Sequence, residues 1–258
     1  MSMLFMVTLL TAAQATSPSP LVADSKSVPP VQTAETAVPA KPSLTPEMRA
    51  DIAMARKDYR LAIDIFKSIQ PATHITLNKI GIAYHQLTEI DSARRFYERA
   101  IKSKPDYAEA VNNLGTIFYA GKSYRRAITQ YNRALKIAPN SASIYSNLGT
   151  AWFARRNYDR ASEAYQKALE LDSEVFEHRS TNGVLLQERS VEERAKFHFY
   201  LAKTYAKAGM NERALLYMRK ALEEGFKERK RFVEDPEFAQ LQQVPEFQEL
   251  LVLQPRVL

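Results

Sequence analysis

The chain of 258 residues has no cysteine, and glycine is scarce, with only seven residues. Without cysteine, disulfide bonds, cysteine-ligated zinc sites, thiolate nucleophiles and acylation of a lipoprotein cysteine are all excluded. Scarce glycine argues against glycine-rich phosphate-binding loops and favours a helical chain. Both shortages point away from metal-stabilised and nucleotide-binding folds.

Motifs of catalysis and metal binding are also missing. The sequence has no phosphate-binding G-x-x-x-x-G-K-S/T, no G-x-G-x-x-G and no G-x-S-x-G. None of the four histidines lies in H-E-x-x-H or another metal-ligand spacing: His74, His85, His178 and His198. The only cluster that could be inspected for chemistry is His178 with Glu177 and Arg179. We therefore predict a protein that is not an enzyme and holds no cofactor or metal.

Positive charge is in excess, with 36 Lys and Arg against 29 Asp and Glu, a net charge of +7. Such a surface favours acidic partners, anionic membranes or nucleic acid. Residues 16–44 are rich in Pro, Ser, Thr, Ala and Val, have no helical or strand period, and have charges that cancel. They are predicted to be a disordered linker, so the excess charge belongs to the rest of the chain.

The N-terminus resembles an export signal. An apolar run from Leu4 to Leu10 is followed by Ala13-Gln14-Ala15, a small-x-small cleavage site. The run is too short for a transmembrane helix, which needs about 20 residues. We predict a signal peptide over residues 1–15, cleavage near Ala15, and a periplasmic or secreted protein. No Lys or Arg precedes the run, which leaves an unprocessed apolar tail as the alternative.

Five kinds of position recur at one constant step along the chain, the step that separates Gly81 from Gly115. They are Gly81, Gly115 and Gly149; Ala93, Ala127 and Ala161; Tyr97, Tyr131 and Tyr165; Ala100, Ala134 and Ala168; and Pro105 and Pro139. A fixed period of this length predicts stacked helical hairpins. Small residues let two antiparallel helices approach closely, so Gly81 is expected to face Ala93. The prolines would end each second helix.

This pattern resembles the tetratricopeptide repeat (TPR) family, with Leu-Gly and an aromatic on helix A and Ala, an aromatic and Ala on helix B. The resemblance implies an all-α fold, a right-handed α-solenoid of TPR hairpins with a C-terminal helical cap. The predicted units are a degenerate TPR at 45–73, TPRs at 74–107, 108–141, 142–173 and 191–226, an insertion loop at 174–190 and capping helices at 227–258.

Two segments interrupt the period. The insertion contains a turn signal at residues 180–183, then an apolar triplet at 184–186 that suits a short strand or an apolar flap. Ser190 with Glu193 forms a capping box, which predicts a helix start. The insertion either lengthens one connection or contacts a partner. In the tail, Pro236 and Pro245 mark two short helix starts whose apolar residues would cover the last repeat.

The resemblance also implies that the A helices line a concave groove for a protein or peptide. The candidate groove residues are Asn78, Lys79, Asn112, Asn113, Thr116, Tyr119, Asn147, Thr150, Lys196 and Lys203. Asn113 and Asn147, at equivalent places in successive repeats, resemble an asparagine ladder whose amides hold a peptide backbone. The alternative is a solvated helix face. Lys79 with Asn78 and Asn113 only loosely resembles a carboxylate clamp, because the full set is absent.

Lys196, Lys203 and Lys207 would make one end of this groove positive and favour an acidic peptide, unless they are simply a solvated lysine face. The predicted function is a non-catalytic scaffold or adaptor in the bacterial cell envelope that binds a protein partner. The alternative is a basic scaffold for an anionic polymer, either nucleic acid or acidic polysaccharide. Nucleic acid is disfavoured by the export signal and by the lack of a stacking platform among the basic residues. Membrane contact stays compatible with the charge.

Overall fold

The computed structural model describes residues 44–177 and 190–253. The predicted signal peptide, most of the linker, the turn at 180–183 and the apolar triplet at 184–186 lie outside these residues. His178 and Arg179 lie outside them as well.

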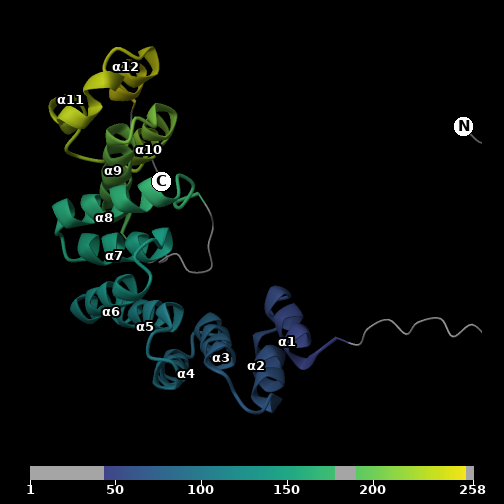
Figure 1. The fold of residues 1–258 in the computed structure, drawn as a ribbon. Helices are drawn as coiled ribbons and strands as arrows, with labels where there is room; N and C mark the ends of the chain where they lie inside the picture. The colour runs from purple at the N-terminus through teal and green to yellow at the C-terminus, as the bar shows by residue number, and fades with distance from the viewer. Residues whose placement is uncertain (1–43, 178–189, 254–258) are drawn as a thin grey trace, which may run out of the picture. The chain divides into compact units, whose positions relative to one another are not determined.

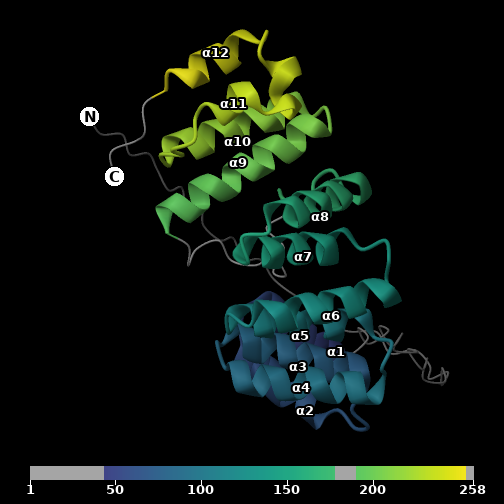
Figure 2. The same cartoon turned by 90° about the vertical axis from the view of Figure 1, so that its left-hand side faces the viewer.

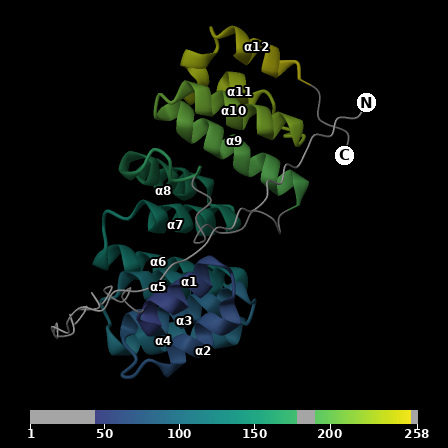
Figure 3. The same ribbon diagram turned by 90° about the vertical axis from the view of Figure 1, so that its right-hand side faces the viewer.

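The described residues form helices that follow one another as antiparallel pairs (Figure 1). The first four pairs are α1 (Pro46–Ala55) with α2 (Tyr59–Ser68), α3 (His74–Gln86) with α4 (Ile90–Ser103), α5 (Ala108–Ala120) with α6 (Tyr124–Ile137), and α7 (Ala142–Ala154) with α8 (Tyr158–Leu171). The fifth pair is α9 (Val191–Lys207) with α10 (Asn211–Glu223), which run side by side in Figure 3. The end of the described chain holds α11 (Arg231–Glu234), the 3₁₀ helix η2 (Pro236–Leu241) and α12 (Pro245–Leu251).

Each hairpin of the three regular repeats closes on a glycine of helix A and a tyrosine of helix B. A Cβ atom added to Gly81 would lie 2.6 Å from Cε1 of Tyr97, and one added to Gly115 would lie 2.6 Å from Cε1 of Tyr131. The nearest neighbour of both glycines is therefore the tyrosine ring, and for a Cβ at the equivalent Gly149 a backbone oxygen of Ala161 also lies at 3.2 Å. The glycine makes room for a fully buried aromatic ring.

The turns between the two helices of a pair depend on a left-handed residue. In four turns it is not glycine: Lys57, Thr88, Lys122 and Arg156 have φ between 56° and 63°. Gly121, the residue before Lys122, has φ of −78°, so the left-handed residue of this turn is Lys122. Backbone bonds hold this conformation, with Lys122 N donating to Tyr119 O at 2.8 Å.

The helix starts predicted at Ser190, Pro236 and Pro245 are confirmed, and α10 ends in a glycine cap. The Ser190 side chain accepts a hydrogen bond from Glu193 N at 3.2 Å and caps α9. Gly225 follows α10 with φ of 81°, and Phe226 N donates to Ala221 O, which is a Schellman closure. Pro236 and Pro245 occupy the first turns of η2 and α12.

The C-terminal elements pack on the fifth hairpin: η2 contacts α9, and α12 contacts α10 (Figure 2). Four aromatic side chains meet there, all of them buried: Phe199, Phe226, Phe232 and Phe238. The predicted fold class, an all-α solenoid of helical hairpins with a C-terminal cap, is confirmed. Within the described ranges, no helix is both long and apolar enough to cross a bilayer.

Candidate functional site

The four candidate asparagines bond to one another between successive A helices. Asn113 Nδ2 donates to Asn78 Oδ1 at 3.0 Å, and Asn147 Nδ2 donates to Asn112 Oδ1 at 3.0 Å. None of the four is more than 6% exposed. The separation in sequence is the same for both bonds, so one contact recurs at two junctions. These amides link α3 to α5 and α5 to α7, and their role in holding a peptide stays a prediction.

Glu109 extends the first of these contacts. Its Oε1 accepts a hydrogen bond from Asn78 Nδ2 at 2.8 Å, and its Oε2 accepts one from the Tyr107 hydroxyl at 2.6 Å. Burial and the neighbouring carboxylate both raise the pKa of Tyr107 well above its ordinary value. Both the side-chain oxygen and the amide nitrogen of Asn78 are therefore hydrogen-bonded to other side chains of the protein.

Thr116 and Thr150, each on a helix A, contact a tyrosine of the helix B in the same hairpin. The Tyr131 hydroxyl lies 3.4 Å from Thr116 Oγ1, and the Tyr165 hydroxyl lies 3.3 Å from Thr150 Oγ1. The Thr150 hydroxyl donates to Ser146 O at 2.9 Å. The two threonines occupy equivalent positions, so each closes the hairpin on the tyrosine that packs against the glycine.

Because the asparagines are buried, replacing one should destabilise the fold. We expect Asn147→Ala to lower the free energy of unfolding by about 1–2 kcal/mol, because it leaves the buried Asn112 oxygen without its donor. Urea denaturation measures the change. Asn132→Ala, on an exposed part of α6, is the matched control and should change the stability by less than about 0.5 kcal/mol. Equal stability of both variants would contradict a structural role for the pair.

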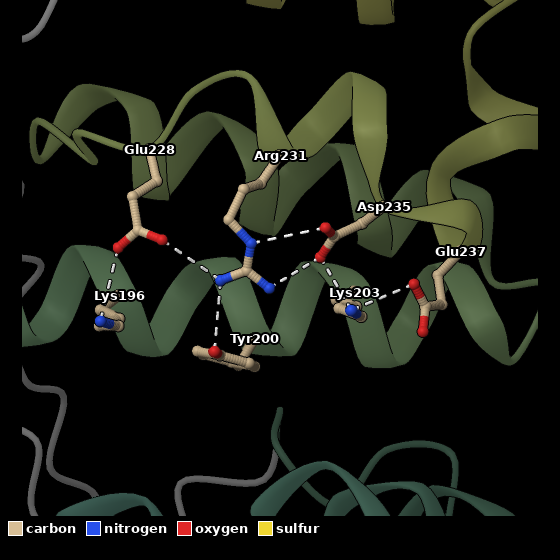
Figure 4. Close-up of polar contacts among 7 residues, drawn as sticks. All are labelled: Lys196, Tyr200, Lys203, Glu228, Arg231, Asp235 and Glu237. Atoms are coloured by element: carbon tan, nitrogen blue, oxygen red, sulfur yellow. Dashed lines mark hydrogen bonds and ion pairs between the residues drawn. The ribbon is translucent and has the colours of Figure 1, made fainter. Parts of the chain in front are cut away.

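The two candidate lysines of α9 are paired with the C-terminal segment (Figure 4). Lys203 Nζ lies 2.8 Å from Asp235 Oδ2 and 3.2 Å from Glu237 Oε2, and its side chain is only 20% exposed. Lys196 Nζ lies 3.5 Å from Glu228 Oε1. The chain's own carboxylates thus compensate the charges that were expected to attract an acidic peptide at this end.

Arg231 completes this network. Its guanidinium donates to Asp235 Oδ2 at 2.9 Å and to the Tyr200 hydroxyl at 3.3 Å (Figure 4). It also stacks over the Phe199 ring, 4.5 Å from the ring centroid. Burial on its own would raise the pKa of Asp235, but the hydrogen bonds from Lys203 and Arg231 outweigh it and lower that pKa below its ordinary value. The segment after α10 is therefore held against α9 by ionised groups.

Lys79 and Tyr119 are placed differently. Lys79 Nζ lies 2.6 Å from Asp51 Oδ1, a bond that joins α3 to α1. Tyr119 is half-buried at the end of α5, with its ring centroid 5.3 Å from that of Tyr124. The structure thus pairs the asparagines between A helices and the threonines with tyrosines of helix B. Lys79 lies apart from them, whereas Tyr119 and Lys196 line one pocket.

An exposed apolar surface at the first two A helices was missed by the sequence reasoning. Leu44, which precedes α1, is 47% exposed, and Met48 in the first turn of α1 is 50% exposed. Ile75 on α3 is 47% exposed and lies four residues before Lys79. Since residues four apart share a helix face, the Lys79–Asp51 bond places both apolar faces beside each other. The i, i+4 spacing of Leu44, Met48 and Ile52 was the available signal.

The described residues contain no group of His, Cys, Asp and Glu side chains arranged to hold a metal ion. Glu177, from the one cluster singled out for chemistry, is 2.9 Å from the Arg213 guanidinium and accepts from the Tyr217 hydroxyl at 3.2 Å. These bonds tie the start of the insertion to α10.

Family models match three stretches of the chain. Residues 76–107 and 142–174 match models of the tetratricopeptide repeat, and residues 115–155 match a model described as a TPR repeat. These segments are tetratricopeptide repeats. Such repeats generally serve as modules for protein interactions, and the matches therefore support a protein-interaction scaffold.

Solved structures resemble the chain at low identity. A crystal structure of MamA is 22% identical, covering 70% of this chain and 96% of its own, with a TM-score of 0.48. MamA residues 41 to the end from Desulfovibrio magneticus RS-1 are 19% identical, covering 76% and 93%, also with a TM-score of 0.48. A comparison with curated protein sequences finds no match.

Proposed function

We propose that this chain is a non-catalytic adaptor that holds a segment of a protein partner along the face formed by its A helices. The observation that supports this most is the exposed apolar surface of Leu44, Met48 and Ile75, each about half exposed. Contiguous apolar surface on a soluble protein often marks an interaction site. The ion pair of Lys79 with Asp51 fixes the two helices that carry it.

The partner segment is expected to contribute apolar side chains to this face. The buried asparagines hold α3, α5 and α7 in a fixed spacing, so this part of the A-helix face is formed before binding. A preformed surface costs little ordering on binding. The proposed location is the bacterial cell envelope, which rests on the apolar run and cleavage motif of residues 4–15.

A peptide-display selection with the full-length chain tests this proposal. Short random peptides would be selected, and their affinity measured by fluorescence anisotropy. We expect Met48→Asp with Ile75→Asp to weaken binding at least tenfold, because a charge on the apolar face leaves the partner's apolar groups against a hydrated carboxylate.

The matched control is Leu61→Asp with Leu216→Asp, two similarly exposed residues on B helices. It should change the affinity less than twofold, and both double variants should keep the thermal midpoint of the parent. An equal loss in the two variants would count against the A-helix face.

A scaffold for an anionic polymer is the second candidate, supported by the net charge of +7. Many of the cations are paired within the fold, among them Lys79, Lys203, Arg213 and Arg231. Polymer binding that falls by orders of magnitude between about 50 and 200 mM salt would support this candidate over the first.

A further inference from the structure

A pocket of about 520 Å³ lies where the turn after α5, the turn after α7 and the start of α9 meet. Its volume is within the range of about 300–1,000 Å³ that is typical of ligand pockets. Tyr119 and Lys196 were among the predicted groove residues, but the sequence did not suggest that they meet here, because the insertion separates α9 from the two repeats that supply the other walls.

Four aromatic rings line the pocket: Tyr119, Tyr124, Phe153 and Tyr158. They form two equivalent pairs, since Tyr119 with Tyr124 and Phe153 with Tyr158 each have ring centroids 5.3 Å apart. Tyr158 is also stacked on Tyr200 of α9, with centroids 4.7 Å apart. These ring contacts fix the walls, so an aromatic guest would meet a preformed surface.

Two exposed cations stand at the pocket, Lys122 and Arg156, at equivalent places in successive repeats and both in the left-handed conformation of a turn. Neither takes part in an ion pair of the described chain, unlike the lysines of α9. Arg125 and Arg126 follow in the first turn of α6, which carries no acidic residue. Positive charge is unfavourable at a helix N-terminus, so an anion there would relieve it.

Other charges at the pocket are largely compensated. Lys196 lies over the Tyr158 ring at 4.7 Å and is 3.5 Å from Glu228 Oε1. Glu192 is 3.2 Å from Lys227, and Glu193 remains as an acidic group on the α9 side. The positive potential is therefore on the side of the two turns, and a guest carboxylate would approach from there.

We propose that this pocket takes an aromatic side chain of the partner segment, with a neighbouring Asp or Glu of that segment paired with Lys122 and Arg156. The inference rests on the proposed binding of a protein segment and names the chemistry of that segment. A nucleic acid strand fits less well, because Glu193 would repel a continuous phosphate backbone along the α9 wall.

The peptides selected on the full-length chain supply the probe. We expect them to be enriched in an aromatic residue next to Asp or Glu. Lys122→Glu with Arg156→Glu should weaken their binding at least tenfold. The matched control is Lys57→Glu with Lys104→Glu, which makes the same change in net charge away from the pocket, and Lys57 occupies the same left-handed turn position. The control should weaken binding less than twofold.

Three outcomes would overturn the inference. Selected peptides could lack the aromatic and acidic pair, the two charge-reversed variants could lose affinity equally, or a single-stranded oligodeoxythymidine could bind the pocket more tightly than the peptides. The two proposals fail separately. If only Met48→Asp with Ile75→Asp weakens peptide binding, the proposal for the pocket is wrong. If only Lys122→Glu with Arg156→Glu weakens it, the proposal for the face of α1 and α3 is wrong.

Discussion

Replacing Phe232 with alanine is expected to lower the free energy of unfolding by about 3–5 kcal/mol. The side chain is fully buried, and its ring centroid lies 5.1 Å from those of Phe199 and Phe238 and 5.7 Å from that of Phe226. Removing it opens a cavity between α9 and the C-terminal segment, where the four rings meet. Urea denaturation followed by circular dichroism measures the change.

Val233→Ala is the matched control, because Val233 is the next residue and 48% exposed. It should change the stability by less than about 0.5 kcal/mol. A comparable loss for both variants would mean that the aromatic cluster does not hold the cap on the fifth hairpin.

The repeats were predictable because their signal depends on positions and not on packing detail. The constant step between repeats fixes where Gly115 and Tyr131 fall, and a hairpin that buries a tyrosine needs a glycine opposite. What the period could not give is the partner of each glycine. The pattern shows small residues on both helices, and only the structure shows that the ring lies nearest.

The sequence singled out the candidate residues but not the contacts that they make. The amides of the asparagines bond across a separation one residue longer than the repeat, which the period does not suggest. Lys203 was expected to face a partner, whereas the acidic residues that pair with it lie far along the chain, in a segment with no repeat pattern. Long-range pairs of this kind depend on tertiary packing.

The C-terminal cap explains why the side chains at the candidate groove positions of α9 differ from those of the earlier A helices. In α5 the corresponding positions are Asn112 and Asn113, which bond to neighbouring A helices, whereas in α9 they are Phe199 and Tyr200. An aromatic pair cannot continue the amide contacts, and the C-terminal segment covers it with Arg231. The array of amide contacts therefore ends before the fifth hairpin.

The close approach inside each hairpin gives the last prediction. Gly115→Ala should lower the free energy of unfolding by about 2–3 kcal/mol, because the new Cβ would lie 2.6 Å from the Tyr131 ring in a packed interior. Gly121→Ala is the matched control, since its Cβ would meet nothing closer than 3.6 Å and its φ of −78° suits alanine. It should leave the stability within about 0.5 kcal/mol of the parent.

A double-mutant cycle then assigns the cost to the ring. On a Tyr131→Leu background the clash is relieved, so Gly115→Ala should cost at least about 1 kcal/mol less than it does in the parent chain. Additive effects would place the strain elsewhere in the hairpin, and a neutral Gly115→Ala would remove the tyrosine contact as the reason for glycine. If the coupling is found, the same glycine and tyrosine pair accounts for the hairpins of α3 with α4 and of α7 with α8, whose distances are nearly identical.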